Sequence, residues 1–153
     1  MRKLILIASA VFVSLGSFAQ SMESAMEKRA KEMVHVIGLT DQEQYKKFVK
    51  ENYSEAFINK PMKARVETSE NDGTSTSGSK NETTEAANIE GKAGMFGRLH
   101  EDFGDSKVIS SKITGEKLVM VVEGSNGMRG TFTLKFATTK PYLIDGLGVE
   151  VGN

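Results

Sequence analysis

The densest group of polar side chains beside an apolar helical pattern is His100-Glu101-Asp102. A histidine and a carboxylate that face one pocket form a general acid–base pair. Neighbouring residues of a helix point about 100° apart, so these three side chains cannot converge on one substrate atom. We therefore expect His100 and Asp102 to face solvent or to form local hydrogen bonds, and we assign no catalytic residue.

Residue types and spacing disfavour four other kinds of site. His35 is the only other histidine and the chain has no cysteine, so we expect neither a zinc site nor a cysteine nucleophile. Gly124-Ser125-Asn126-Gly127 lacks the Gly-x-Ser-x-Gly spacing of a serine hydrolase. Neither a helix pattern nor Gly-Lys-Ser/Thr follows these glycines, which disfavours a nucleotide site. We expect no metal and no cofactor.

Proton transfer is the catalytic chemistry that the residues leave open. Ketosteroid isomerases use an aspartate base with tyrosine or protonated aspartic acid as hydrogen-bond donors. Residues of these types near apolar segments are Tyr45, Tyr53, Tyr142, Asp102, Asp105 and Asp145. No spacing joins them into a set, and tyrosines on helical stripes are more often core residues.

The first 19 residues have the pattern of a secretory signal peptide. Arg2 and Lys3 precede an apolar run over residues 4–15, and Ser17 and Ala19 are the small residues of a cleavage site. The run is too short for a membrane-spanning helix. We therefore expect an exported protein, periplasmic or secreted, with one domain over residues 20–153 and no membrane span after cleavage.

The charge of the exported part argues against a nucleic-acid partner. Removing Arg2 and Lys3 from the 20 basic residues leaves 18 against 20 acidic residues, a net charge of −2. Nucleic-acid binders carry a concentrated basic surface.

Residues 67–85 contain no apolar side chain. Such a segment cannot offset the entropy of ordering its backbone, about 1–2 kcal/mol per residue. We predict a flexible polar loop here, between two parts of one shared core.

Apolar spacing predicts helices on both sides of this loop. Residues 20–38 carry one apolar stripe, which consists of Met22, Met26, Ala30, Met33 and Ile37. This stripe packs on the sheet, or it forms an adaptable binding face or a dimer face. Thr40 and Glu43 match a capping box for a second helix that ends at Asn59-Lys60-Pro61. Its predicted buried residues are Tyr45, Phe48, Val49, Asn52 and Ala56, with Tyr53 and Phe57 beside them. After the loop, the helical spacing of five residues predicts a helix that ends at Gly104: Ala93, Phe96, Leu99, His100 and Phe103.

From Ser106 onward the period of the apolar residues changes to two. The predicted strands cover residues 107–113, 117–123, 128–136 and 142–151. The continuous apolar run 118–122 indicates a central strand buried on both faces. In the last strand, Leu143, Leu147, Val149 and Val151 would share one face, and Gly146 and Gly148 on the other indicate a bulge or a close neighbour. The fold class is therefore α+β, with two or three N-terminal helices packed on a four-stranded antiparallel meander.

Four segments carry a resemblance to a known family: residues 44–54, 99–105, 130–134 and 141–149. They are similar to small exported domains of the nuclear-transport-factor-2-like or cystatin-like fold, which precede secreted serine hydrolases in Bacteroidetes-type bacteria. The resemblance covers most of residues 45–151 outside the polar loop. It implies a cone-like curved sheet with a concave face that holds a ligand. No hydrolase segment follows here, so an accessory role would serve a separate exported enzyme.

These patterns favour an exported, non-catalytic accessory or binding module for a small apolar ligand or an exported partner protein. The side chains that we predict to contact a ligand are Tyr45, Phe48, Tyr53, Phe96, Phe132 and Tyr142. The alternatives are an isomerase- or hydratase-like enzyme on the same fold and a structural protein that forms a homodimer.

Overall fold

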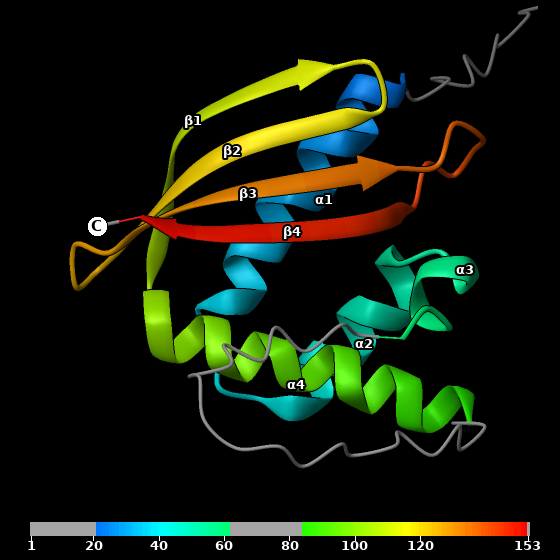
Figure 1. The fold of residues 1–153 in the computed structure, drawn as a ribbon, viewed down its shortest axis with the longest axis horizontal. Helices are drawn as coiled ribbons and strands as arrows, with labels where there is room; N and C mark the ends of the chain where they lie inside the picture. Colours follow the sequence, from blue (N-terminus) through cyan, green and yellow to red (C-terminus); the bar gives the residue numbers. More distant parts are fainter. Residues whose placement is uncertain (1–20, 62–83, 153) are drawn as a thin grey trace, which may run out of the picture.

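The computed structural model describes residues 21–61 and 84–152 (Figure 1). The predicted signal peptide and residues 67–83 of the predicted polar loop lie outside these described residues. Within them, helices precede strands in the order α1 (Met22–Ile37), α2 (Gln42–Asn52), α3 (Glu55–Ile58), α4 (Glu85–Phe103), β1 (Ser106–Thr114), β2 (Lys117–Gly124), β3 (Arg129–Phe136) and β4 (Ile144–Gly152). No helix in these two ranges is long and apolar enough to cross a membrane.

The strands form one antiparallel sheet in the order β1-β2-β3-β4, which confirms the predicted α+β meander. Leu118 pairs with Leu134, and Phe132 pairs with Val149, so neighbouring strands present apolar side chains on the same face. Helix α1 crosses behind the sheet in Figure 1 and packs on β1 and β2, while α2 packs on α4. Together, the helices and the inner face of the sheet enclose one core.

Helix α1 begins where a serine caps it. The Ser21 Oγ accepts a hydrogen bond from the backbone N–H of Ser24 at 3.2 Å, which satisfies a donor that the first turn leaves free. Met26 and Met33 on the predicted stripe are both 0% exposed. The methionine stripe therefore packs into the core.

The second predicted helix is divided into α2 and α3, and its start was predicted one residue early. Asp41, not Thr40, is the cap, since its carboxylate accepts from the N–H of Glu43 at 2.9 Å. The chain is extended at Tyr53, and the Ser54 Oγ starts α3 by accepting from the N–H of Phe57 at 3.1 Å.

This break explains a wrong prediction about burial. The N–H of Ser54 donates to the Ile144 carbonyl at 2.8 Å, so it cannot continue the hydrogen-bond ladder of α2. The new helix turns Phe57 into the core and leaves Ala56, which was predicted to be buried, exposed.

Helix α4 begins at Glu85, the last residue of the predicted polar loop, where the Thr84 Oγ1 accepts from the N–H of Ala87 at 3.3 Å. The predicted end at Gly104 is confirmed. This glycine has a φ of 54°, a conformation that other residues rarely adopt. The buried stripe of α4 extends one turn further toward its N-terminus than predicted and includes Ile89 and Lys92.

The prediction that residues 118–122 would be buried on both faces is wrong. Leu118 and Met120 are each 1% exposed, but Val119 between them is 38% exposed. The described helices pack against the face that carries Leu118, and an antiparallel sheet tolerates water on its other face. We call this open side the outer sheet face, and its central residues are Val119, Val121, Thr131 and Thr133.

Strand β4 begins at Ile144, two residues later than predicted, and contains the bulge expected near Gly146. Gly146 pairs with Lys135 and Ile144 with Phe136, so Asp145 is the extra residue. Because one extra residue switches the face of the side chains that follow, Ile144, and not Leu143, occupies the fully buried position.

Candidate functional site

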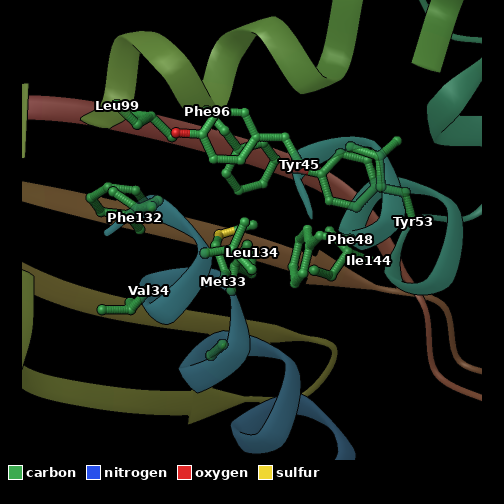
Figure 2. Close-up of a cluster of buried hydrophobic side chains, with 14 of the residues drawn as sticks. Met33, Val34, Tyr45, Phe48, Tyr53, Phe96, Leu99, Phe132, Leu134 and Ile144 are labelled. Atoms are coloured by element: carbon green, nitrogen blue, oxygen red, sulfur yellow. The ribbon is translucent and has the colours of Figure 1, made fainter. Parts of the chain in front are cut away.

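Five of the six side chains predicted to contact a ligand lie in the core (Figure 2). Tyr45, Phe48, Tyr53, Phe96 and Phe132 are each at most 2% exposed. The ring centroids of Tyr45 and Phe96 are 5.7 Å apart, and those of Phe48 and Phe96 are 5.2 Å apart. These are ordinary spacings for packed aromatic rings, so the side chains hold the helices to the sheet.

The sixth predicted residue, Tyr142, lies apart from this cluster in the turn before β4. Its carbonyl accepts a hydrogen bond from the Arg29 Nε at 3.1 Å, and the Pro141 carbonyl accepts from Nη2 of the same guanidinium at 3.0 Å. Arg29 also donates to the Asn52 side chain at the end of α2. Sequence reasoning missed Arg29, which joins three segments distant in the sequence.

The two histidines have different surroundings. His35 is exposed. The His100 Nδ1 lies 2.8 Å from the Ile37 carbonyl oxygen, which links α4 to the end of α1. The expectation of a solvent-facing or local role is therefore wrong for His100, because its partner is distant in the sequence. Asp102 is exposed, as expected.

The candidate residues for proton transfer do not come together. Asp102 and Asp105 are exposed, and Asp145 accepts a hydrogen bond from the Ser54 Oγ at 2.6 Å. The Tyr53 hydroxyl is buried and has no hydrogen-bond partner among the described residues, and its burial raises the pKa of this phenol. None of these carboxylates is thus buried opposite a tyrosine hydroxyl.

A hollow of about 400 Å³ opens where α3, α4 and β4 meet. We call it the Lys92 groove, and its lining residues are Phe57, Lys60, Pro61, Lys92, Met95, Gly146 and Leu147. Its volume is within the range of about 300–1,000 Å³ that is usual for small-molecule sites. Phe57, Met95 and Leu147 belong to the core or pack against it, so part of the lining is apolar.

The position of Lys92 follows from the spacing of α4. Ile89, Lys92 and Phe96 are three and four residues apart, which places the lysine on the core-facing stripe. Lys92 is 4% exposed, and no other charged side chain is buried in the described residues. A signal in the sequence could have identified this buried lysine: it lies at helical spacing between the apolar residues Ile89 and Phe96.

The two groups that contact the ammonium group of Lys92 are neutral. Its Nζ donates to the Lys60 carbonyl at 3.0 Å and lies 4.3 Å from the centroid of the Phe57 ring. In the described part of the chain, no carboxylate forms an ion pair with it. Burial, and then the nearby charge of Lys60, lower the pKa of Lys92.

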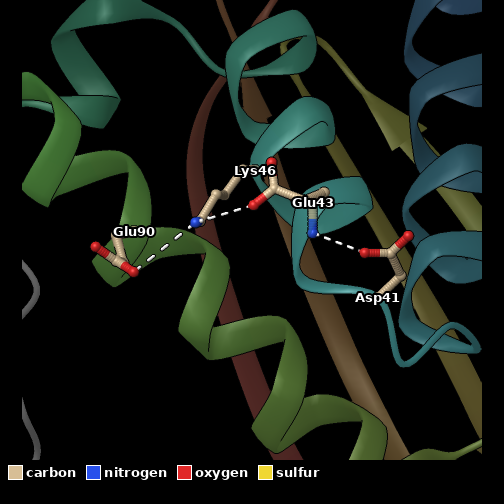
Figure 3. A network of polar contacts seen from close by, with 4 residues as sticks. All are labelled: Asp41, Glu43, Lys46 and Glu90. Carbon is tan, nitrogen blue, oxygen red and sulfur yellow. Dashed lines mark hydrogen bonds and ion pairs between the residues drawn. The ribbon is translucent and has the colours of Figure 1, made fainter.

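Lys46 on the adjacent helix α2 shows the contrasting arrangement (Figure 3). Its Nζ lies 3.2 Å from a Glu43 carboxylate oxygen and 3.8 Å from one of Glu90. The hydrogen bond and charge of Glu43, and the charge of Glu90, raise the pKa of this half-buried lysine. Lys46 thus has the counter-ions that the described residues do not give Lys92.

Two other hollows between described residues have no buried charged side chain in their lining. One of about 500 Å³ lies at the hairpin turn that includes Asn126 and Gly127. One of about 190 Å³ lies between α1 and the first two strands. No group of three His, Asp or Glu side chains in residues 21–61 and 84–152 is close enough to hold a metal ion.

The comparisons with known proteins give no family for this chain. It matches no protein-family model, and no curated protein or solved structure matches it significantly. The resemblance to nuclear-transport-factor-2-like domains is therefore still a prediction.

Proposed function

We propose that this chain is an exported, non-catalytic binding module that holds a small and largely apolar ligand in the Lys92 groove. The observation that carries the proposal is the groove itself. It provides about 400 Å³ beside a core in which the large aromatic side chains are fully packed. An open apolar hollow with a few polar groups is the usual form of a small-molecule site.

The lining of the groove favours binding over catalysis. Its side chains include two lysines but no carboxylate, histidine or hydroxyl group. A lysine nucleophile needs a second group that accepts and returns protons, and proton transfer of the isomerase type needs a carboxylate base. The export part of the proposal rests on the signal-peptide pattern of residues 1–19.

The groove adjoins the aromatic cluster whose side chains were predicted from the sequence to contact a ligand. The ring centroids of Phe57, in the lining, and Tyr53, in the core, are 4.8 Å apart. A ligand that contacts Phe57 would therefore affect Tyr53, one of the predicted ligand contacts, without touching it.

An NMR titration of residues 20–153 with 1-decanol tests the proposal. We expect the methyl signals of Met95 and Leu147 to shift, because both residues line the groove. Met95→Trp should fill the groove and abolish the shift at Leu147. Met22→Trp, on the distant helix α1, is the matched control and should retain it. Shifts that persist in Met95→Trp would contradict the assignment of the site.

A second candidate function, binding of an exported partner protein, is supported by the outer sheet face. Its central residue Val119 is 38% exposed. Strand pairing places on this face the cations Lys107, Lys112, Lys117, Arg129 and Lys135 and the carboxylates Glu123 and Glu150.

The charge of the outer sheet face favours an acidic partner. Glu123 lies 3.1 Å from Lys107 and 2.6 Å from Arg129, and hydrogen bonds from Arg129 and then Lys107 lower its pKa. The cations therefore remain in excess. Two copies stacked on these faces would repel each other, whereas an acidic protein surface would be complementary.

A further inference from the structure

Resting on the proposed function, we infer that the ligand of the Lys92 groove is an anionic amphiphile: an aliphatic chain with an anionic head group that pairs with Lys92. The starting observation is a buried lysine whose ammonium group contacts a backbone carbonyl and an aromatic ring but no carboxylate of the described residues. Lys92 is 4% exposed, and its hydrogen-bond partner is a backbone carbonyl. Buried charges in proteins are normally paired, because removing an ion from water costs several kcal/mol.

The hydrogen-bonding capacity of Lys92 leaves room for a ligand. A lysine ammonium has three donors, and in the described residues one of them is used, toward the Lys60 carbonyl at 3.0 Å. The Phe57 ring 4.3 Å away stabilises the cation but accepts no conventional hydrogen bond. An anionic oxygen in the groove would satisfy a remaining donor and balance the charge.

A second cation makes an anion more favourable still. Lys60 lines the same groove, and its charge contributes to the lowered pKa of Lys92. Two cations that share one hollow repel each other, and a single anionic group between them removes that repulsion. A neutral apolar ligand would leave both charges uncompensated.

The apolar part of the ligand follows from the rest of the lining. Met95 is three residues after Lys92 and therefore one turn further along the same face of α4. Leu147 of β4 lines the groove as well. A head group at Lys92 thus places an aliphatic chain over Met95 and Leu147. This chemistry is common to free fatty acids and to anionic lipids with one acyl chain.

Calorimetric titration of residues 20–153 with three probes tests the inference. The probes are decanoate, lysophosphatidylglycerol and neutral 1-decanol. We expect at least one anionic probe to bind at least tenfold more tightly than 1-decanol, since a charge-assisted hydrogen bond is stronger than a neutral one. Tighter binding of decanoate would indicate a free fatty acid, and tighter binding of lysophosphatidylglycerol would indicate a lipid.

Lys92→Met removes the charge and keeps an unbranched apolar side chain. We expect it to abolish the preference for the anionic probe, to retain 1-decanol binding and to raise Tm. Lys46→Met is the matched control and should leave all three affinities unchanged, because Lys46 is outside the groove. Lys92→Gln repeats the test if Lys92→Met fails to fold.

The outcomes separate the two proposals. Equal binding of 1-decanol and the anionic probes, unchanged in Lys92→Met, overturns the anionic head group but supports the binding module. If no probe binds at millimolar concentration, the proposed function fails as well. A lower Tm of Lys92→Met together with unchanged anion binding would also overturn the inference, because Lys92 would then have a structural partner.

Discussion

Two buried tyrosines that pack on the same phenylalanine offer a matched pair of stability measurements. Tyr45 and Tyr53 are each 1% exposed, and their ring centroids lie 5.7 and 6.5 Å from that of Phe96. The Tyr45 hydroxyl donates to the Leu39 carbonyl, whereas the Tyr53 hydroxyl has no hydrogen-bond partner in the described part of the chain. Replacing either tyrosine by phenylalanine removes only the hydroxyl, so the two variants should change stability in opposite directions.

The magnitudes follow from the state of each hydroxyl. A buried polar group without a partner costs about 1–3 kcal/mol, so Tyr53→Phe should raise the free energy of unfolding by that amount. The packing is kept, because the ring centroid of residue 53 lies 4.8 Å from Phe57 and 5.9 Å from Phe48. Tyr45→Phe loses a hydrogen bond and should lower the free energy of unfolding by about 0.5–1.5 kcal/mol.

Urea unfolding of residues 20–153 at neutral pH, followed by circular dichroism, measures both effects. An increase in the midpoint with an unchanged m-value is expected for Tyr53→Phe and a decrease for Tyr45→Phe. If Tyr53→Phe is less stable than the wild type, the reasoning is refuted, because the hydroxyl must then have a hydrogen-bond partner.

The pH dependence of stability provides a second readout for Tyr53. Burial raises the pKa of its hydroxyl above the ordinary value, so the folded state retains this proton at a pH where the unfolded state releases it. The unfolded state then binds fewer protons, and stability should fall as the pH rises above about 10. Tyr53→Phe should reduce this fall, and an equally steep fall in the variant would contradict the assignment.

Three further predictions concern the frame around the groove and the outer sheet face. Ser54→Ala removes the cap of α3 and the bond to Asp145, so urea unfolding should show a loss of about 1–2 kcal/mol; an unchanged midpoint would exclude a stabilising cap. Arg29→Lys cannot reproduce the guanidinium geometry that joins α1 to the turn before β4, so calorimetry should record a lower Tm, and an equal Tm would count against this role. If like charges keep two outer sheet faces apart, Val119→Asp should leave the sedimentation coefficient unchanged. A wild-type dimer that becomes a monomer in this variant would contradict the charge argument for the outer sheet face.

The local spacing of apolar residues predicted the helices and strands well, because the buried side chains of each element recur with the period of its backbone. The methionines of α1 recur at helical spacing, and Met26 and Met33 are fully buried. Alternation predicted the inner face of β3, where Phe132 and Leu134 are each 0% exposed. Both results depend on side chains that point in fixed directions from a regular backbone.

Local pattern failed where a distant segment supplies the hydrogen bond. Nothing near Ser54 in the sequence indicates that its N–H donates to the Ile144 carbonyl at 2.8 Å, yet this bond ends α2 and reorients Phe57. The same limit applies to His100, whose partner Ile37 lies on another helix. Side-chain type alone does not identify such partners, because only the folded chain brings them within reach.

The sequence by itself determined the fold class, the order of the elements and the apolar face of most of them. Tertiary structure alone decided that the predicted ligand residues Tyr45 and Phe96 fill the core, while Lys92 borders an open groove. It also decided that β2 faces water on one side. The physical reason is that the period of a helix or strand fixes the direction of each side chain. Its burial and the compensation of its charge depend on which other elements pack against that side.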